Sequence, residues 1–441
     1  MEEIGNSWTN IVPFVAGRRI GDDFEFALRP SAEEEEIVSV FFSRIRERNG
    51  DPRADVAVWY GPPRGLQLDG PPLLQDQVWI NAGRERERLA GRIARFVKKQ
   101  APWAEWIEVI CYAAKTAWER GEAVQQLSAV ADTGELSYLI HPLLPDGETT
   151  LLYGDGESGK SLLAMFVAVV AATGVDLPGI ELRGAPCSVL YLDWETNAGI
   201  AARRMNQITA GYGIAPPSGI YYRRMARALS DDLRIVRAEV DRLGVGLVII
   251  DSVGPACGGS PSKEELIVPF FNAVRSLGRT ALLISHISKM EAGIEGTKAT
   301  PIGSVYSRNL SRQTWLARRA EGVEESDAIY VALFHTKANE SKRFRPIGLR
   351  IAFTANTIRV AGVSPGDVPA LAEHLPLAAR VRSLLSQRKH TAKELAEQLG
   401  VAESTVRGVL VKMPDTLAVE PGGPRKPAVW ALRAVDGDEP F

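Results

Sequence analysis

The chain has 441 residues, which is more than one hydrophobic core usually organises, so two or three domains are expected. Hydrophobic residues make up 45% and charged residues 24%, a balance that excludes a disordered or fibrous chain. The net charge of −2 excludes a chain that is strongly basic or acidic as a whole.

Cysteine usage and the first residues favour a cytoplasmic protein. Cys111, Cys187 and Cys257 fit neither a zinc-binding spacing nor a disulfide framework, as expected in a reducing compartment. The opening MEEIGNSWTN lacks the basic and apolar regions of a signal peptide. No apolar run reaches the length of about 18 residues that predicts a membrane helix, so no membrane partner is expected.

Residues 1–130 predict an α/β domain whose role the sequence does not indicate. Strands are expected at 54–61 and 73–83, and helices at 31–48, 84–100 and about 101–130. The first helix is predicted from the spacing of apolar residues after a capping Ser31. In the second, Leu89, Ile93 and Phe96 are expected to face inward. Trp103, Trp106 and Trp118 are expected in the core rather than on a base-stacking surface.

The clearest motif lies in residues 149–170. An apolar run predicts a strand, a second apolar run predicts a helix, and GDGESGKS between them fits the phosphate-loop pattern GxxxxGK[ST]. Glycines let the backbone wrap around phosphate oxygens, Lys160 can reach the β- and γ-phosphates, and Ser161 can ligate Mg²⁺. The residues expected to bind ATP are Gly154, Asp155, Gly156, Glu157, Ser158, Gly159, Lys160, Ser161 and Leu162.

Residues 131–360 alternate between strand and helix patterns, which predicts an α/β domain built on a parallel sheet. Strands are expected at 188–195, 246–252 and 280–289, and helices at 199–213, 231–245 and 266–278. Pro269 is expected in the first turn of the last helix. The segments RQTWLARRA, AIYVALFHTK and LRIAFTA predict antiparallel strands that complete the sheet.

Three residues at strand ends are candidates for the chemistry. Asp251 follows four apolar residues and is the expected Mg²⁺ carboxylate beside Ser161. Ser252 comes next instead of a glutamate, so the carboxylate that activates water must come from elsewhere. Glu195 is the expected base, with Asp193 as its rival and a helix-capping acid as the alternative. His286 is expected to sense the γ-phosphate or the attacking water, unless it is an ordinary polar residue.

The C-terminal part is a separate basic module. Residues 361–375 predict a linker, 376–433 three short helices and two strands, and 434–441 a flexible tail. Residues 376–433 contain ten Lys or Arg against five Asp or Glu, a balance that points towards nucleic acid. Thr391 and Glu394 form a capping box, and Gly400 is placed to end that helix.

This module resembles a winged helix-turn-helix domain, in which residues 403–413 are the recognition helix. The resemblance implies contacts with duplex DNA, and docking onto a protein is the alternative. The residues expected to touch DNA are Ser404, Thr405, Arg407, Lys412, Arg425 and Lys426.

About half of the chain, residues 137–350, resembles the RecA-type core of hexameric replicative helicases, most closely the RepA-like helicases of plasmids, phages and mobile elements. The similar stretches are SYLIHPLLPDGETTLLYGDGESGKS, VLYLDWETNAGIAARRM, LVIIDS, SHISK, IGSVYSRNLSR and HTKAN. The resemblance implies a homohexameric ring around single-stranded DNA, ATP at subunit interfaces, and replication partners. It also implies Glu195 as the catalytic glutamate and His286 as the sensor.

An arginine from the neighbouring subunit completes the site in this family, and Arg312 matches that position best. Lys337 is the second candidate, with Arg343 and Arg345 close behind it. The expected activity is ATP-dependent translocation on DNA or unwinding of it. Two alternatives remain open: an ATP-regulated DNA-binding switch, and an accessory ATPase of recombination or transposition.

Overall fold

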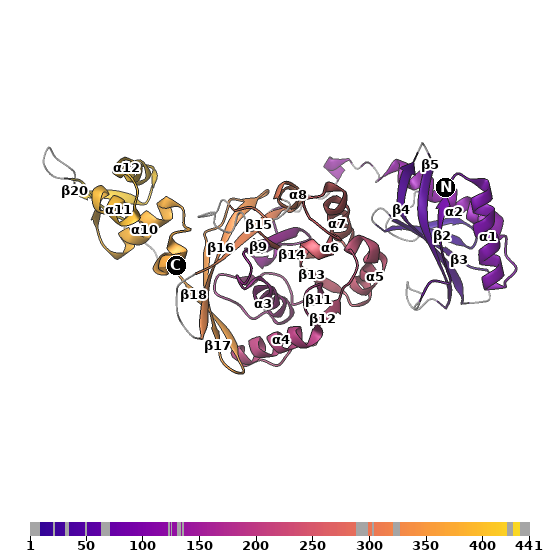
Figure 1. Cartoon of the computed structure of the whole chain (residues 1–441), viewed down its shortest axis with the longest axis horizontal. Coiled ribbons are helices and arrows are strands. Elements are labelled where there is room, and N and C mark those ends of the chain that lie inside the picture. Colours follow the sequence, from indigo (N-terminus) through magenta and orange to yellow (C-terminus); the bar gives the residue numbers. More distant parts are fainter. Residues whose placement is uncertain are drawn as a thin grey trace. The chain divides into compact units, whose positions relative to one another are not determined.

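The computed structural model describes residues 9–20, 23–30, 35–48, 51–62, 71–121, 124, 126–129, 134, 136–287, 299–301, 304–320, 327–420 and 427–432. The chain divides into two compact units, of which the first comprises residues 1–135, 228–244 and 268–278 and the second comprises the rest. Figure 1 labels their elements. None of the described helices is long and apolar enough to cross a membrane.

A six-stranded antiparallel sheet forms the N-terminal part, with its strands in chain order. The strands are β1 (Thr9–Val12), β2 (Val15–Ile20), β3 (Asp23–Leu28), β4 (Ile37–Arg48), β5 (Asp51–Gly61) and β6 (Leu74–Trp79). Two helices follow, α1 (Gly83–Val97) and α2 (Trp103–Arg120), and then a short 3₁₀ turn (Leu127–Ala129). Their apolar side chains share one core with one face of the sheet.

The helix expected at 31–48 is wrong, because Ile37–Arg48 is strand β4. Val38, Val40 and Phe42 alternate along this strand and are fully buried. β4 pairs with β3 on one side and β5 on the other. β-branched and aromatic residues pack well on such a surface, and these pairings override the helical spacing. The capping role expected of Ser31 lies outside the described residues.

The two helices largely follow the prediction. Leu89 and Ile93 of α1 are buried, but Phe96 is 48% exposed and Val97 takes the inward position instead. α2 ends at Arg120, ten residues before the expected limit. Trp103 and Trp106 pack edge to face in the core, with ring centroids 5.4 Å apart, as predicted for core residues.

A nine-stranded sheet organises the second unit, in the order β12-β11-β13-β14-β9-β15-β16-β17-β18. The first six strands are parallel, namely β12 (Ile220–Arg224), β11 (Ser188–Asp193), β13 (Val245–Asp251), β14 (Thr280–His286), β9 (Thr149–Gly154) and β15 (Gln313–Arg319). Antiparallel pairing adds β16 (Ala328–Ala338), β17 (Ile347–Phe353) and β18 (Ile358–Val363). The predicted parallel sheet with an antiparallel extension is therefore present. The first of the three segments expected to be antiparallel, RQTWLARRA, differs in part, because its strand β15 pairs in parallel with β9 and antiparallel with β16.

The helices between these strands occur near the predicted positions. They are α3 (Lys160–Thr173), α4 (Ala198–Tyr212), α5 (Leu229–Arg242), α6 (Val253–Ala256), α7 (Glu264–Ser276) and α8 (Ser304–Leu310). Pro269 lies inside α7 beyond its first turn, because the helix begins at Glu264. A small sheet joins β7 (Tyr138–His141), β8 (Leu144–Pro145) and β10 (Glu181–Leu182).

Helix α3, which follows the phosphate loop, is buried in the core of the second unit. It is apolar on nearly all sides, and its residues from Leu163 to Ala171 are buried. Phe166 packs edge to face with Tyr212 of α4. A helix buried all round is fixed by packing on every side, so the loop that precedes it has a fixed base.

The C-terminal part has its own small core. After a short 3₁₀ turn (Pro365–Asp367) and α9 (Pro369–Ala372), which fall within the expected linker, come α10 (Leu377–Gln387), α11 (Ala392–Leu399) and α12 (Glu403–Lys412). A three-stranded sheet contains β19 (His390–Thr391), β21 (Val429–Leu432) and β20 (Thr416–Glu420). Thr391 and Glu394 form the predicted capping box, and Gly400 ends α11 in the left-handed conformation.

Candidate active site

The phosphate loop joins β9 to α3, as its sequence predicts. Gly154 lies so close to β15 that an added Cβ would stand 2.4 Å from the carbonyl oxygen of Ala317. Gly159 has φ = 83°, a left-handed conformation that glycine adopts without strain, and α3 begins at the next residue. Only glycine suits these two positions, which explains the glycine spacing of the motif.

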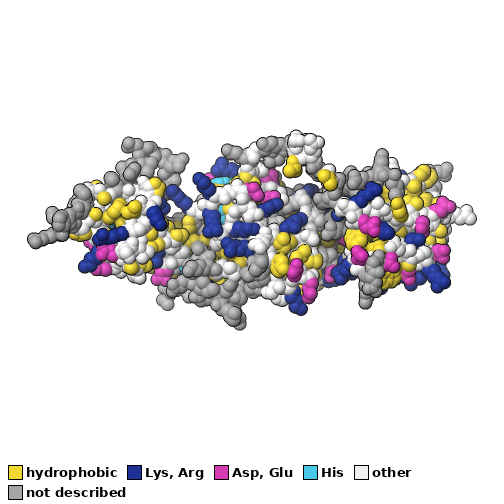
Figure 2. All heavy atoms as spheres, turned by 90° about the horizontal axis from the view of Figure 1, so that it is seen from above, with side chains coloured by type: hydrophobic (Ala, Val, Ile, Leu, Met, Phe, Trp, Pro, Cys, Tyr) yellow, Lys and Arg dark blue, Asp and Glu magenta, His cyan; other side chains and the backbone are white. Residues whose placement is uncertain are grey.

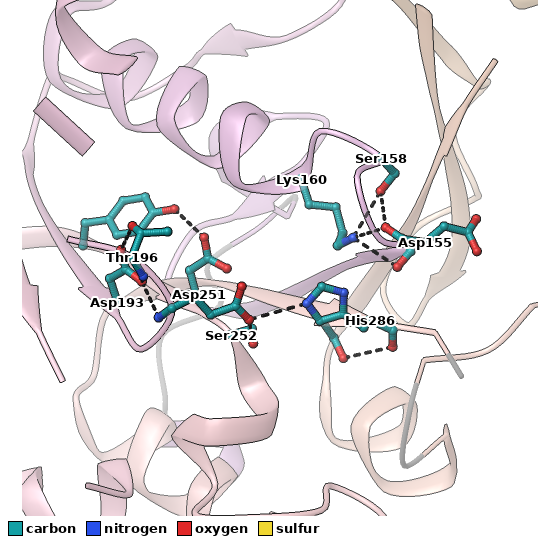
Figure 3. Close-up of polar contacts among 12 residues, drawn as sticks. Asp155, Ser158, Lys160, Asp193, Thr196, Asp251, Ser252 and His286 are labelled. Carbon is teal, nitrogen blue, oxygen red and sulfur yellow. Dashed lines mark hydrogen bonds and ion pairs between the residues drawn. The ribbon is translucent and has the colours of Figure 1, made fainter. Parts of the chain in front are cut away.

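Lys160 is buried and directed at its own loop. Its Nζ donates to the carbonyl oxygens of Gly154, at 3.1 Å, and Asp155, and to the Ser158 hydroxyl at 3.1 Å (Figure 3). Burial lowers the pKa of this ammonium to about 8, and the nearby Asp251 opposes the shift. Burial disfavours the charged form of Lys160, and the negative charge of a bound triphosphate would favour it again. The loop therefore fits an anionic ligand.

An ion pair behind the loop was not anticipated from the sequence. Arg318 of β15 is 4% exposed, and its Nη1 lies 2.6 Å from Asp155 Oδ2. The next residue, Arg319, donates to the Glu157 carbonyl oxygen at 3.4 Å. Arg318 thus balances a carboxylate that stands inside an anion-binding loop. The paired arginines of RQTWLARRA were visible in the sequence, but their register against Gly154 was not.

Asp251 and Ser161 suit a divalent cation. Asp251 is 3% exposed and ends β13. Its Oδ2 accepts a hydrogen bond from Tyr191 at 2.7 Å. Burial raises its pKa. Its buried Oδ1 has no hydrogen-bond partner among the described residues, so one hard oxygen ligand is available to Mg²⁺.

The carboxylate of Glu195 contacts two side chains that could orient it, Ser252 and His286. Its Oε1 accepts a hydrogen bond from the Ser252 hydroxyl, and His286 Nε2 lies 3.5 Å from the same oxygen. Ser252 directly follows β13 and His286 is the last residue of β14 (Figure 3). The hydrogen bond from His286 is the main cause that lowers the pKa of Glu195 to about 2. The carboxylate is therefore ionised, as a base must be.

Strand register explains how these groups meet. In the parallel sheet Asp193 pairs with Asp251, and His286 pairs with Gly154. The C-terminal ends of four adjacent strands thus form one edge beside the phosphate loop. Sequence reasoning predicted each strand end separately, and the structure brings them together.

Asp193, the rival base, has a structural role. It is 2% exposed, and its Oδ1 accepts hydrogen bonds from the backbone N–H groups of Glu195 (2.7 Å) and Thr196 (2.9 Å). Its Oδ2 accepts from the Tyr222 hydroxyl at 3.1 Å. These bonds fix the turn that carries Glu195, and they occupy the carboxylate that a base would need free.

The predicted cations lie far from this chain's own phosphate loop. The backbone N–H of Arg312 donates to the Thr149 carbonyl oxygen at the start of β9, whereas the loop follows the end of that strand. Five residues of strand span about 17 Å. Lys337 donates to the carbonyl oxygens of Arg308, Asn309 and Ser311. Neither side chain can complete this site from within the same chain.

The residues predicted to contact DNA form a separate set on α12. Ser404, Thr405, Arg407 and Lys412 are exposed, whereas Val406 and Leu410 face the small core. Arg407 pairs with Glu403, with Nη2 and Oε1 2.7 Å apart. Arg425 and Lys426 lie outside the described residues.

Comparison with known proteins gives a family match that spans this site. Residues 120–292 match a family described as an AAA domain, and they include the phosphate loop, Glu195, Asp251 and His286. Matching solved structures include a KaiC-like protein from the hyperthermophilic archaeon Pyrococcus horikoshii OT3, with 16% identity and a TM-score of 0.36, over 52% of this chain and 98% of that chain. No curated protein matches the sequence.

The parallel sheet, the phosphate loop and the AAA-domain match together support a P-loop ATPase core. Such cores bind a nucleoside triphosphate with Mg²⁺. In this chain the groups available to bind the triphosphate and Mg²⁺ are the loop backbone, Lys160, Ser161 and Asp251.

Proposed function

We propose that the protein is an ATP-dependent DNA translocase or helicase of the RepA-like type, acting as a homohexameric ring in replication of a plasmid, phage or other mobile element. The observation that carries the proposal is the contact of Glu195 with His286 and Ser252 at the edge of the sheet. It supports a hydrolysing site whose base is coupled to a neighbouring strand, rather than a site that only binds nucleotide.

In this proposal Glu195 accepts the proton of the attacking water, and its ionised state at neutral pH suits that role. Lys160 and the loop N–H groups hold the phosphates. Bound Mg²⁺ supplies charge neutralisation at the β- and γ-phosphates. His286 orients Glu195 and links it to the chain segment that follows β14.

Assembly into a ring would supply the missing cation. Arg312 is 52% exposed at its side chain and pairs only loosely with Glu148, at 3.4 Å. Exposed ion pairs of this kind contribute about 0–1 kcal/mol, so another subunit's triphosphate could replace Glu148. Arg312, with Lys337 as the second candidate, is therefore proposed to serve the neighbouring subunit.

The C-terminal module is proposed to be a winged helix that binds duplex DNA. Its support is the exposed polar face of α12 and the antiparallel pair β20–β21 behind it. A regulatory switch is the second candidate function, because a DNA-binding module beside an ATPase could equally report the nucleotide state. An accessory ATPase of recombination is the third.

Steady-state ATP hydrolysis with and without single-stranded DNA tests the proposal. The wild type should be stimulated by single strands. Lys160→Ala should abolish turnover, whereas Glu195→Gln should bind ATP but lose at least about a hundredfold in kcat. Glu181→Gln, an exposed residue paired with Arg183, is the matched control. Slow turnover that single strands leave unchanged would favour the switch, and normal turnover by Glu195→Gln would reject the assigned base.

A further inference from the structure

A cavity of about 400 Å³ lies around the C-terminal end of β16, and none of the phosphate-loop residues 154–161 lines it. Its lining comes from several segments of the chain and includes Tyr153, Arg308, His335, Thr336, Arg343 and Phe344. Its volume falls in the range of small-ligand sites, roughly 300–1,000 Å³. None of the residues identified above in the ATPase chemistry of this chain lines it.

The cavity is electropositive. Arg308 and Arg343 line it, and none of the described residues that line it is acidic. Lys337 stands beside it and holds the carbonyl oxygen of Arg308 at 2.7 Å from its Nζ, so the backbone at Arg308 is fixed. Figure 2 shows Lys and Arg side chains gathered over the middle of the view. A cavity with two guanidinium groups and no carboxylate selects an anionic ligand.

Electrostatic effects on neighbouring groups agree with this charge. Burial, assisted by Arg343, lowers the pKa of His335 to about 4, so this imidazole is neutral at physiological pH. Burial together with Arg308 and Arg312 lowers the pKa of Lys337. Burial is the larger cause in both cases, and the charged groups that add to it are cations, whose effect a phosphate would oppose.

The walls of the cavity are aromatic rings held in fixed orientations. Of these rings, His335 and Phe344 line the cavity and stack on each other, with centroids 5.4 Å apart and an interplanar angle of 13°. Trp315, which does not line the cavity, stacks on His335 at 4.4 Å and 4°. The backbone N–H of Phe344 donates to His335 Nδ1 at 3.0 Å. The Tyr153 hydroxyl bonds to Ala299 and Thr336, at 3.1 Å and 3.0 Å. Rings fixed in advance lose little entropy when a planar group packs against them.

We propose that this cavity binds one nucleotide of a single-stranded nucleic acid, with the base against the aromatic wall and the phosphate at Arg308 and Arg343. Aromatic stacking beside cations is how single strands are bound without sequence preference. The inference rests on the proposed function, since it names where the translocated strand is held. A free mononucleotide shares the same chemistry, and the experiment separates the two.

The test is fluorescence anisotropy of the full-length protein with a labelled oligothymidylate of about 20 nucleotides, longer than the roughly 4–16 that common single-strand modules cover. Arg343→Ala should weaken binding at least about fivefold. Lys342→Ala removes the same charge from the adjacent exposed residue, which does not line the cavity, and should change binding less than about twofold. Equal losses in the two variants would reject the cavity.

Stacking is tested with Phe344→Leu, which keeps an apolar side chain, and with an abasic strand of equal length. This variant should weaken binding of oligothymidylate at least about fivefold and leave binding of the abasic strand unchanged, a difference that misfolding could not produce. Equal losses on both strands would reject base stacking.

Competition by thymidine monophosphate identifies the ligand. Its failure to displace the strand at millimolar concentration supports a strand site. If the protein binds thymidine monophosphate but not the labelled strand, the proposal that this cavity holds a single strand is overturned. Failure of the wild type to bind any single strand would instead reject the proposed function.

Discussion

Arg318 and Asp155 form an ion pair that joins strand β15 to the phosphate loop, with 2.6 Å between Nη1 and Oδ2. The arginine is buried. The aspartate occupies one of the positions that the phosphate-loop pattern leaves open. A carboxylate in an anion-binding loop would repel a triphosphate unless a cation balanced it. The register that places Ala317 beside Gly154 puts Arg318 where it can do so.

This pair predicts a rescue experiment. Arg318→Met keeps the side-chain length but exposes the triphosphate to the charge of Asp155, and the Kd for ATP should rise about tenfold. The loss of binding free energy is then a part of the interaction energy of two unit charges, which is roughly 4 kcal/mol at 4 Å and an effective dielectric constant near 20. Adding Asp155→Asn should restore most of the affinity. Arg183→Met, at an exposed arginine paired with Glu181, is the control. Failure of Asp155→Asn to restore binding would show that Arg318 only supports packing.

The contact of His286 with Glu195 predicts a change in the pH profile. In the wild type the lowered pKa, about 2, keeps Glu195 ionised throughout the assay range, so its protonation does not limit kcat. Removing the hydrogen bond lets burial raise this pKa, and the acid limb of kcat should therefore begin at higher pH in His286→Ala.

His286→Gln, which retains a hydrogen-bond donor, should keep the acid limb closer to its wild-type position. The measurement is kcat against pH at saturating ATP for the three proteins. An unchanged acid limb in His286→Ala would mean that His286 does not act through Glu195.

Close packing of α4 against β18 predicts a stability effect. A Cβ at Gly211 would stand 2.2 Å from the Ile358 carbonyl oxygen, so Gly211→Ala should destabilise this region by about 1–3 kcal/mol. Gly91 also lies inside a helix, α1, but it is exposed and an added Cβ meets nothing within 4 Å. Gly91→Ala should therefore stabilise its helix by about 1 kcal/mol.

Hydrogen exchange measures the two effects separately, because it reports local opening. Amides of α4 and β18 should lose protection in Gly211→Ala, and amides of α1 should gain it in Gly91→Ala. Unchanged protection of α4 in Gly211→Ala would mean that the backbone near Ile358 shifts to make room for the added methyl group at little cost in stability.

Local patterns in the sequence were enough to predict the phosphate loop, its flanking strand and helix, and the capping box at Thr391. Each depends on a few neighbouring residues, so the sequence carries the whole signal. Strand ends at Asp251 and His286 were also recognisable, because apolar runs stop there.

Features set by distant residues were not recognisable. Ile37–Arg48 has apolar residues at helical spacing, and only its pairing with β3 and β5 makes it a strand. Arg318 looked like any surface arginine until register placed it beside Asp155. Asp193 and Glu195 could not be separated by alternation alone, because the hydrogen bonds that occupy Asp193 come from the turn after the strand and from Tyr222 on β12.

Strand displacement on forked duplexes tests the central claim most directly, with one fork bearing a 5′ single-stranded tail and the other a 3′ tail. Wild-type protein with ATP and Mg²⁺ should displace the strand from one fork and not from the other. Glu195→Gln should bind the fork and displace nothing. Robust ATP hydrolysis without displacement on either fork would contradict the account and favour a switch or an accessory ATPase.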